Sequence, residues 1–134
     1  MAESKASPRP RSPHLGIYRW PVTMSTSIIH RVTGFGLALG TLLLAWWLVA
    51  AAMGPGPYAD FQALANSWFG LFVLLGFTLS LCFHAVNGIR HLAWDLGYGF
   101  AMPTANRTGI IVYILAVVLT WAIWMGAYYA MGKL

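Results

Sequence analysis

The chain has 134 residues, of which 59% are hydrophobic and only 8% are charged. Soluble domains carry about 25% charged residues, so this composition excludes a soluble domain and indicates an integral membrane protein. The formal net charge of +5 comes from basic residues that lie mostly on one side of the expected membrane. We therefore interpret the charge as a signal of membrane topology and not of nucleic-acid binding.

Residues 1–27 are predicted to form an N-terminal tail on the inner side of the membrane. Pro8, Pro10 and Pro13 lie among Ser and Arg, which is typical of an extended segment that orders only against a partner. The apolar stretch that follows is too long for the ~7–15-residue core of a cleavable leader. We therefore expect the first membrane span to be retained.

Three apolar segments follow the tail, at residues 28–53, 68–92 and 109–131. Each has roughly the ~20 residues that a helix needs to cross a bilayer. We therefore expect an all-α integral membrane protein in which residues 28–134 form a three-helix transmembrane domain. Three spans of this kind are expected to be part of a multi-subunit helix bundle.

Helix breakers and caps mark the connections between these spans. The run Gly54-Pro55-Gly56-Pro57 is expected to end the first span sharply, and residues 58–66 to form a short interfacial helix. Asn106 or Thr108 is expected to cap the third span.

Seven of the eight Lys and Arg residues fall on one side of the predicted spans. Five lie before or at the start of the first span, and Arg90 and Arg107 flank the loop after the second. The positive-inside rule assigns this side to the cytoplasm or matrix. The N-terminus is therefore expected inside and the C-terminus outside.

A polar stripe runs along the second span, where residues recur at intervals of four, three, four and four. Helical geometry places them on one face, which should face protein or a buried cofactor. An ionisable ring among hydrocarbon is costly and normally has a polar partner, a proton path or a metal. The stripe consists of Ser80, His84, Asn87, His91 and Asp95. His84, the deeply placed histidine of this stripe, is therefore the first candidate for function.

A membrane histidine that binds metal through one ring nitrogen is typical of an axial haem ligand. His84 and His91 cannot hold one iron, because seven residues of helix separate them by about 10.5 Å. His14 and His30 are expected near or beyond the inner boundary, so a partner chain is the economical source of a second ligand. His30, Arg31 and His91 are expected roughly two turns nearer the inner surface than His84, where they can meet haem propionates.

The same level suits a lipid quinone, since the hydroxyl of Ser27 and the guanidinium of Arg31 are four residues apart and can hydrogen-bond a quinone carbonyl. The residues alone leave other interpretations open. His84 would also suit an interhelical hydrogen bond, and Arg31 would suit a topology anchor that snorkels to the headgroups. Asp95 would also suit a simple ion pair with Arg90 or His91.

Three blocks of the sequence resemble one family. They are Arg9–Leu15 with Ile17–Arg19, Ser25–Gly34, and His84–Gly97. Their Ser-x-x-His-Arg-x-Thr-Gly and His-x-x-x-Gly-Ile-Arg-His patterns are specific in combination. Together, and in order along the whole chain, they resemble the cytochrome b large membrane-anchor subunit of succinate dehydrogenase, respiratory Complex II.

The resemblance implies a role for each candidate residue. His84 would be an axial ligand of haem b, whose iron the small membrane-anchor subunit would hold from the other side. Ser27 and Arg31 would line a ubiquinone pocket beside the iron–sulfur subunit, and His30, Arg31 and His91 would surround the haem propionates. The chain would not be catalytic alone, because a flavoprotein subunit oxidises succinate and electrons reach quinone through iron–sulfur clusters.

The expected location is the bacterial inner (cytoplasmic) membrane, embedded in lipid, because the N-terminal tail is short and not convincingly amphipathic. The mitochondrial inner membrane is the alternative. Two other function classes remain. One is a di-haem quinone oxidoreductase anchor, which would need two pairs of haem ligands within the membrane. A single deeply placed histidine argues against it. A non-redox bundle subunit, such as a transporter or assembly factor, would use His84 and Arg31 as a polar relay.

Overall fold

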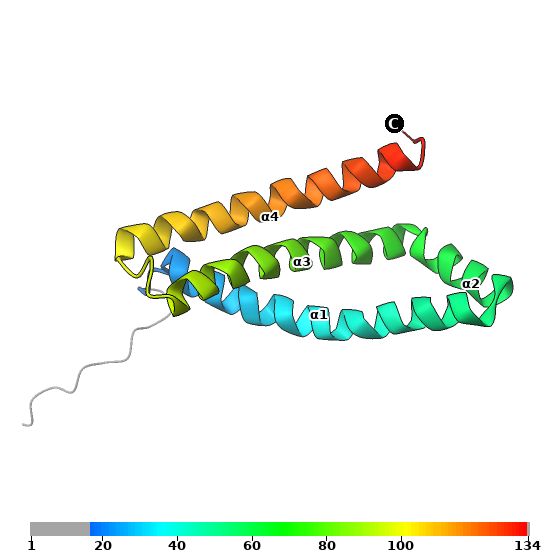
Figure 1. Ribbon diagram of the computed structural model, residues 1–134, viewed down its shortest axis with the longest axis horizontal. Coiled ribbons are helices and arrows are strands. Elements are labelled where there is room, and N and C mark those ends of the chain that lie inside the picture. The colour runs from blue at the N-terminus through cyan, green and yellow to red at the C-terminus, as the bar shows by residue number, and fades with distance from the viewer. Residues whose placement is uncertain (1–16, 134) are drawn as a thin grey trace, which may run out of the picture.

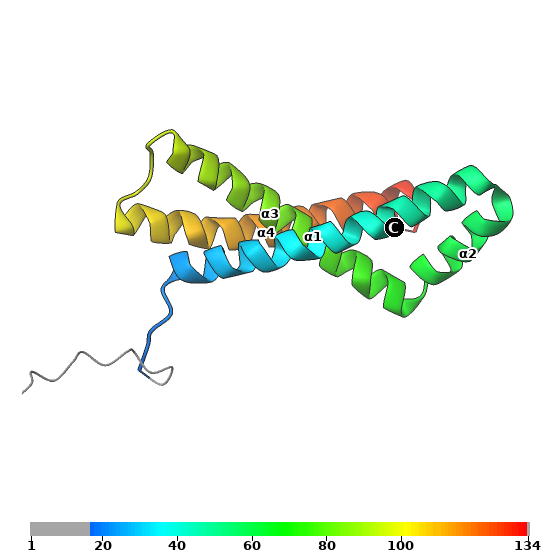
Figure 2. The ribbon, with the colours of Figure 1, turned by 90° about the horizontal axis from the view of Figure 1, so that it is seen from below.

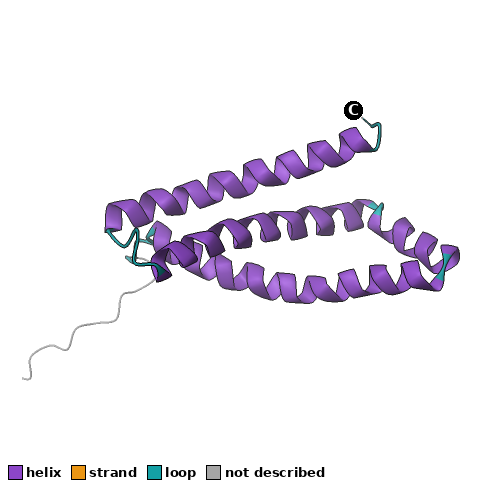
Figure 3. Ribbon diagram, in the orientation of Figure 1, coloured by secondary structure: helices purple, strands orange, loops and turns teal. Residues whose placement is uncertain are grey.

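The computed structural model describes residues 17–133, which form four helices and no strand (Figures 1 and 3). The expected extended tail over residues 1–13 and His14 lie outside the described residues. The helices are, in chain order, α1 (Val22–Met53), α2 (Pro55–Ala65), α3 (Trp68–Asp95) and α4 (Met102–Ala130).

The prediction of an all-α membrane protein with three spans is confirmed. Helices α1, α3 and α4 are each long and apolar enough to cross a bilayer, while the short α2 links α1 to α3 at one end (Figure 1). The three long helices extend beyond the predicted spans at the end of the bundle that the sequence predicts to be inner, and we use inner and outer for the two ends in this predicted sense. In particular, α1 begins at Val22 and α4 at Met102, so polar residues expected at the boundary lie within helices.

The outer connection follows the predicted helix breakers. Gly54 has a φ of 111°, a conformation that favours glycine because it has no Cβ, and it ends α1. Pro55 then opens α2, where its missing N–H leaves no hydrogen bond unmade. Ser67 caps α3, since its hydroxyl oxygen accepts a hydrogen bond from the Gly70 N–H at 3.1 Å. The predicted short helix between the first two spans is present, and it covers Pro55–Ala65.

The inner connection corrects one prediction, because neither Asn106 nor Thr108 caps α4. The helix starts before both residues, with Ala101 at the N-cap position and Pro103 in the first turn. Proline suits a first turn because its N–H would be unpaired there in any case. Thr108 lies inside the helix and its hydroxyl donates to the Thr104 carbonyl at 3.0 Å.

The three long helices come together at the inner end, where α1 starts, α3 ends and α4 starts (Figures 1 and 2). A small apolar core of Cys82, Phe83, Val112 and Ala116 joins α3 to α4. Most large apolar side chains of the spans are exposed. In a membrane subunit this is the surface available to lipid and to neighbouring subunits.

Candidate functional site

Three histidines gather between α1 and α3, and we call His30, His84 and His91 the imidazole cluster. The His30 and His84 rings stack with centroids 3.8 Å apart and an interplanar angle of 8°. The His91 ring lies near His30, with centroids 5.1 Å apart and a tilt of 49°. All three residues are half-buried. The structure thus brings together the three histidines that the sequence places in or next to the spans.

The position of His30 differs from the expectation. It does not lie two turns nearer the inner surface than His84, because its ring stacks directly on the His84 ring. The reason is that α1 begins at Val22, which puts His30 roughly two turns inside the helix. His30 is therefore a residue of the span and not of its inner boundary.

The hydrogen bonds of His84 fix the protonation of its ring. Its Nδ1 lies 3.2 Å from the His30 carbonyl oxygen and 3.3 Å from the Thr33 hydroxyl. A carbonyl can only accept, so Nδ1 carries the proton and Nε2 carries the lone pair. Within residues 17–133 no hydrogen bond reaches Nε2. Metal-ligating histidines commonly donate their other ring N–H to a carbonyl in this way.

The cluster as it stands does not suit a bare metal ion. The lone pairs of stacked rings lie in nearly parallel planes, so the nitrogens of His30 and His84 do not converge on one point. Across the described part of the chain, no group of three His, Cys, Asp or Glu side chains is placed to hold an ion. The geometry fits a group that takes one ligand from this chain, such as a haem. It does not offer the two levels of ligands that a di-haem anchor needs.

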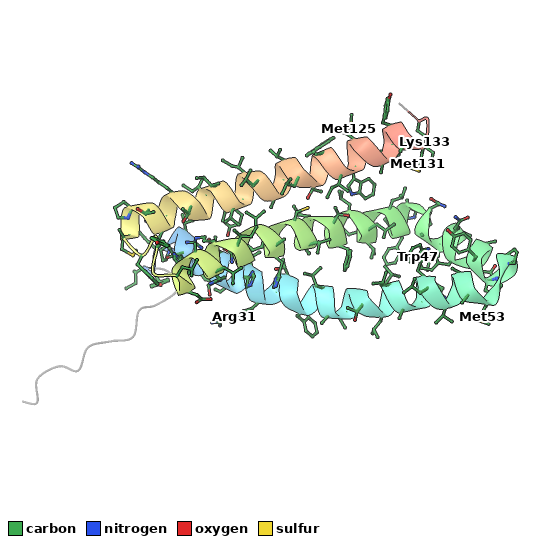
Figure 4. The ribbon with its side chains drawn as sticks, in the orientation of Figure 1. Arg31, Trp47, Met53, Met125, Met131 and Lys133 are labelled. Atoms are coloured by element: carbon green, nitrogen blue, oxygen red, sulfur yellow. The ribbon has the colours of Figure 1, made fainter. Side chains whose placement is uncertain are left out.

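Ser27 and Arg31 lie next to His30 on α1. Ser27 is half-buried and Arg31 is exposed, and Figure 4 shows Arg31 on the side of α1 away from α4. Within residues 17–133 neither side chain makes a hydrogen bond, and the buried His30 Nδ1 has no partner. This edge of the imidazole cluster therefore carries unused donors and acceptors.

A second polar cluster lies between α1, α3 and α4, centred on Arg90, which is only 7% exposed. Its Nε donates to the Thr108 hydroxyl at 3.0 Å, and its Nη2 donates to the Ala105 carbonyl at 2.7 Å. Its Nη1 donates to the Thr26 hydroxyl at 3.2 Å and to the Asn87 side-chain carbonyl at 3.3 Å. We call these five residues the arginine cluster. It joins the three long helices at their inner ends.

The predicted stripe on α3 is not one surface: His84 and His91 belong to the imidazole cluster, Asn87 belongs to the arginine cluster, and Ser80 and Asp95 belong to neither. Asn87 is fully buried and turns toward Arg90, whereas Ser80 lines a groove between α1 and α3. Asp95 is exposed, and no ion pair with Arg90 or His91 is present in the described residues. Arg90 instead lies 4.0 Å from the centre of the Trp94 ring, a cation–π contact.

Sequence reasoning missed the role of Arg90 and the contacts of Thr26, Thr33 and Thr108. A basic residue close to the predicted inner boundary was counted as a topology signal. The available signal was the spacing of Asn87 and Arg90, which are three residues apart and so share a helix face. The hydroxyl groups of Thr26, Thr33 and Thr108 give no such signal, because each contacts a residue of another helix and periodicity does not say how helices cross.

The chain is similar to proteins of one kind along most of its length. Residues 5–123 match the family described as succinate dehydrogenase/fumarate reductase transmembrane subunit. The succinate dehydrogenase cytochrome b556 subunit of Paracoccus denitrificans is 40% identical over 119 residues, covering 89% of this chain and 92% of the relative. The mitochondrial cytochrome b560 subunit of succinate dehydrogenase from Sus scrofa is 40% identical over 116 residues, covering 83% and 67%. The cytochrome b556 subunit of Rickettsia prowazekii is 38% identical over 117 residues, covering 87% and 91%.

Proposed function

The chain belongs to the family of succinate dehydrogenase and fumarate reductase transmembrane subunits, and we propose that it is the haem b-binding membrane anchor of a succinate dehydrogenase. In this role it docks the hydrophilic subunits to the membrane and contributes to the site where ubiquinone is reduced. It oxidises no succinate by itself, since that reaction belongs to partner subunits.

The single observation that carries the haem proposal is the arrangement of His84. The ring lies inside a membrane-spanning helix, its Nδ1 faces the His30 carbonyl at 3.2 Å, and its Nε2 has no partner within the described chain. His84 Nε2 would therefore be one axial ligand, and the small anchor subunit would supply the other. A bound haem b would add a centre that accepts and releases one electron.

His30 stacks on His84 and His91 lies beside His30, while Ser27 and Arg31 are close to His30 along α1. The imidazoles of His30 and His91 and the guanidinium of Arg31 are suited to donate hydrogen bonds to haem propionates. Ser27 and Arg31 keep part of their surface accessible on α1, where a hydroxyl and a guanidinium can hydrogen-bond a quinone carbonyl while its tail stays in lipid. This part of the site would be completed by the iron–sulfur subunit and the small anchor.

The proposed location is a bacterial inner membrane, with the N-terminus and the imidazole cluster toward the cytoplasm. The distribution of Lys and Arg supports this orientation. It puts the quinone-facing residues on the side where iron–sulfur and flavoprotein subunits would sit.

The test is a reduced-minus-oxidised absorption spectrum of the purified complex, recorded for the wild type and for His84→Ala. We expect a haem α band in the wild type and its loss or displacement in the variant, in complexes with the same subunits. An unchanged spectrum in His84→Ala would remove this residue as the ligand. No haem in the wild-type complex would favour the non-redox alternative.

A further inference from the structure

The His84 ring is received by two residues of α1 whose roles go beyond those assigned above, Thr33 and Gly34. Thr33 is 9% exposed, and its hydroxyl lies 2.8 Å from the Ile29 carbonyl and 3.0 Å from the His30 carbonyl. The hydroxyl proton is therefore directed into its own helix. The oxygen is left to act as an acceptor toward His84 Nδ1, which lies 3.3 Å away.

Gly34 gives the ring its space. A Cβ at this position would lie 3.0 Å from His84 Cε1 and 3.6 Å from Nδ1. The ring cannot easily move away, because its face is stacked on His30 at 3.8 Å. A Cβ at Gly36, two residues later on the same helix, would have no neighbour within 4 Å. Of these two glycines, only Gly34 therefore lies against the His84 ring.

We propose that Thr33 and Gly34 are positioning residues for His84, which hold its Nδ1–H tautomer and ring orientation and so tune the donor strength of Nε2 toward haem iron. The proposal rests on the proposed function. Its physical basis is that an acceptor at the outer nitrogen of a ligating histidine fixes the tautomer and raises the basicity of the ligand. A stronger donor favours ferric over ferrous iron and lowers the midpoint potential of the haem.

The first test replaces Thr33 by Val, which keeps the branched shape and removes the acceptor. We expect the complex to keep its haem, because the His30 carbonyl still faces Nδ1, and the haem midpoint potential to shift upward. Thr33→Ser should restore the wild-type potential, since it keeps the hydroxyl. Thr41→Val is the matched control, because Thr41 lies on the same helix and its hydroxyl bonds only the Ala38 carbonyl.

The second test compares Gly34→Ala with Gly36→Ala. The added methyl group at position 34 should displace the His84 ring and change the low-spin haem signal in electron paramagnetic resonance. The same methyl group at position 36 should leave it unchanged. For the first test, if Thr33→Val reduces the amount of assembled complex, the haem midpoint potential is measured instead on the assembled fraction of the smaller variant Thr33→Ala.

The outcomes separate this inference from the proposed function. A wild-type potential in Thr33→Val, together with a wild-type signal in Gly34→Ala, overturns the positioning role even when His84→Ala loses the haem. An unchanged haem spectrum in His84→Ala overturns the proposed function itself. An upward potential shift in Thr33→Val that Thr33→Ser reverses is the result that supports the inference.

Discussion

The arginine cluster and the imidazole cluster share α3, but the central side chain of the first is fully hydrogen-bonded, whereas two ring nitrogens of the second are not. All three guanidinium nitrogens of Arg90 donate hydrogen bonds inside the chain. In the imidazole cluster, His30 Nδ1 is buried without a partner and His84 Nε2 is unengaged within residues 17–133. Both clusters lie in membrane-spanning helices, so their place in the span does not separate them.

The difference indicates which cluster serves the fold and which serves a ligand. Buried polar groups are almost always paired, and an exception calls for an explanation such as a bound group. The arginine cluster is complete by itself, apart from the unpaired Asn87 Nδ2, and it joins three helices. Within residues 17–133 the imidazole cluster leaves His30 Nδ1 and His84 Nε2 without hydrogen bonds. We infer that a cofactor and partner subunits complete it.

The strongest way to break this comparison is Arg90→Met. The change leaves the buried Asn87 carbonyl without its donor and removes the contact with Trp94. An unpaired buried acceptor costs about 1–3 kcal/mol, and with the lost cation–π contact we expect the complex to be destabilised by about 2–4 kcal/mol. Little is regained by removing the charge, because Arg90 is about 7.5 Å from the end of α3 and can snorkel when the helices separate.

The measurement is detergent-induced or thermal dissociation of the purified complex, with haem content recorded per assembled complex. Arg107→Met is the matched control, because Arg107 is exposed on α4 and should have little effect. Equal stability of the two variants would show that the arginine cluster does not hold the helices together.

A smaller loss of stability is expected for Gly109→Ala. A Cβ there would lie 2.8 Å from Val22 Cγ1 and 3.5 Å from Thr26 Cγ2. Val22 is stiff at χ1, so the helices must separate slightly, at a cost of about 1–3 kcal/mol. The same dissociation assay reports it. A Cβ at Gly126 on the same helix would have no neighbour within 4 Å, so Gly126→Ala should be neutral, and a neutral Gly109→Ala would contradict the close contact of α1 with α4.

Substitution of Arg31, which lies next to the imidazole cluster on α1, should change activity and leave stability unchanged. Arg31 is exposed and makes no hydrogen bond within the described chain, so Arg31→Ala should leave dissociation unchanged. We expect quinone reduction by succinate to fall about tenfold, or ~1.4 kcal/mol of transition-state stabilisation, while succinate oxidation by an artificial acceptor persists. Arg107→Ala controls for the loss of one inner basic residue. Equal loss of both activities would indicate failed assembly and not a quinone contact.

The smallest effect is expected for His30→Ala. Removing the ring loses a stacked contact with His84 worth about 0.5–1.5 kcal/mol. The backbone carbonyl that faces His84 remains, so haem should still bind. A loss of haem as complete as in His84→Ala would identify His30 as a ligand.

The sequence predicted the parts of the fold that rest on composition and local chemistry. Apolar length indicated the three spans, and the Gly54 turn and short outer helix followed from the conformational limits of glycine and proline. Helices α1 and α4 begin before the predicted spans, because the polar and basic residues that were taken as boundaries are themselves helical. Pro103 lies in the first turn of α4, before Asn106 and Thr108, the residues expected to cap this helix.

The sequence identified the residues of the candidate site but not how they are arranged in space. His84 and His91 share a helix face by spacing alone, but the stacking of His30 on His84 depends on how α1 crosses α3. The stripe divides because of the helix crossings as well. Asn87 accepts a hydrogen bond from Arg90, which also donates to Thr26 on α1 and to the Ala105 carbonyl on α4. Contacts between helices are not encoded in the periodicity of any one of them.

The central claim is that His84 Nε2 binds haem iron, and a redox titration of the His84→Met complex tests it most directly. Methionine is a weaker donor than imidazole, and haem held by His and Met has a raised potential. The account predicts either loss of the haem or a higher midpoint potential with a displaced α band, in a complex that retains its subunits. A wild-type spectrum and potential in that complex would contradict it.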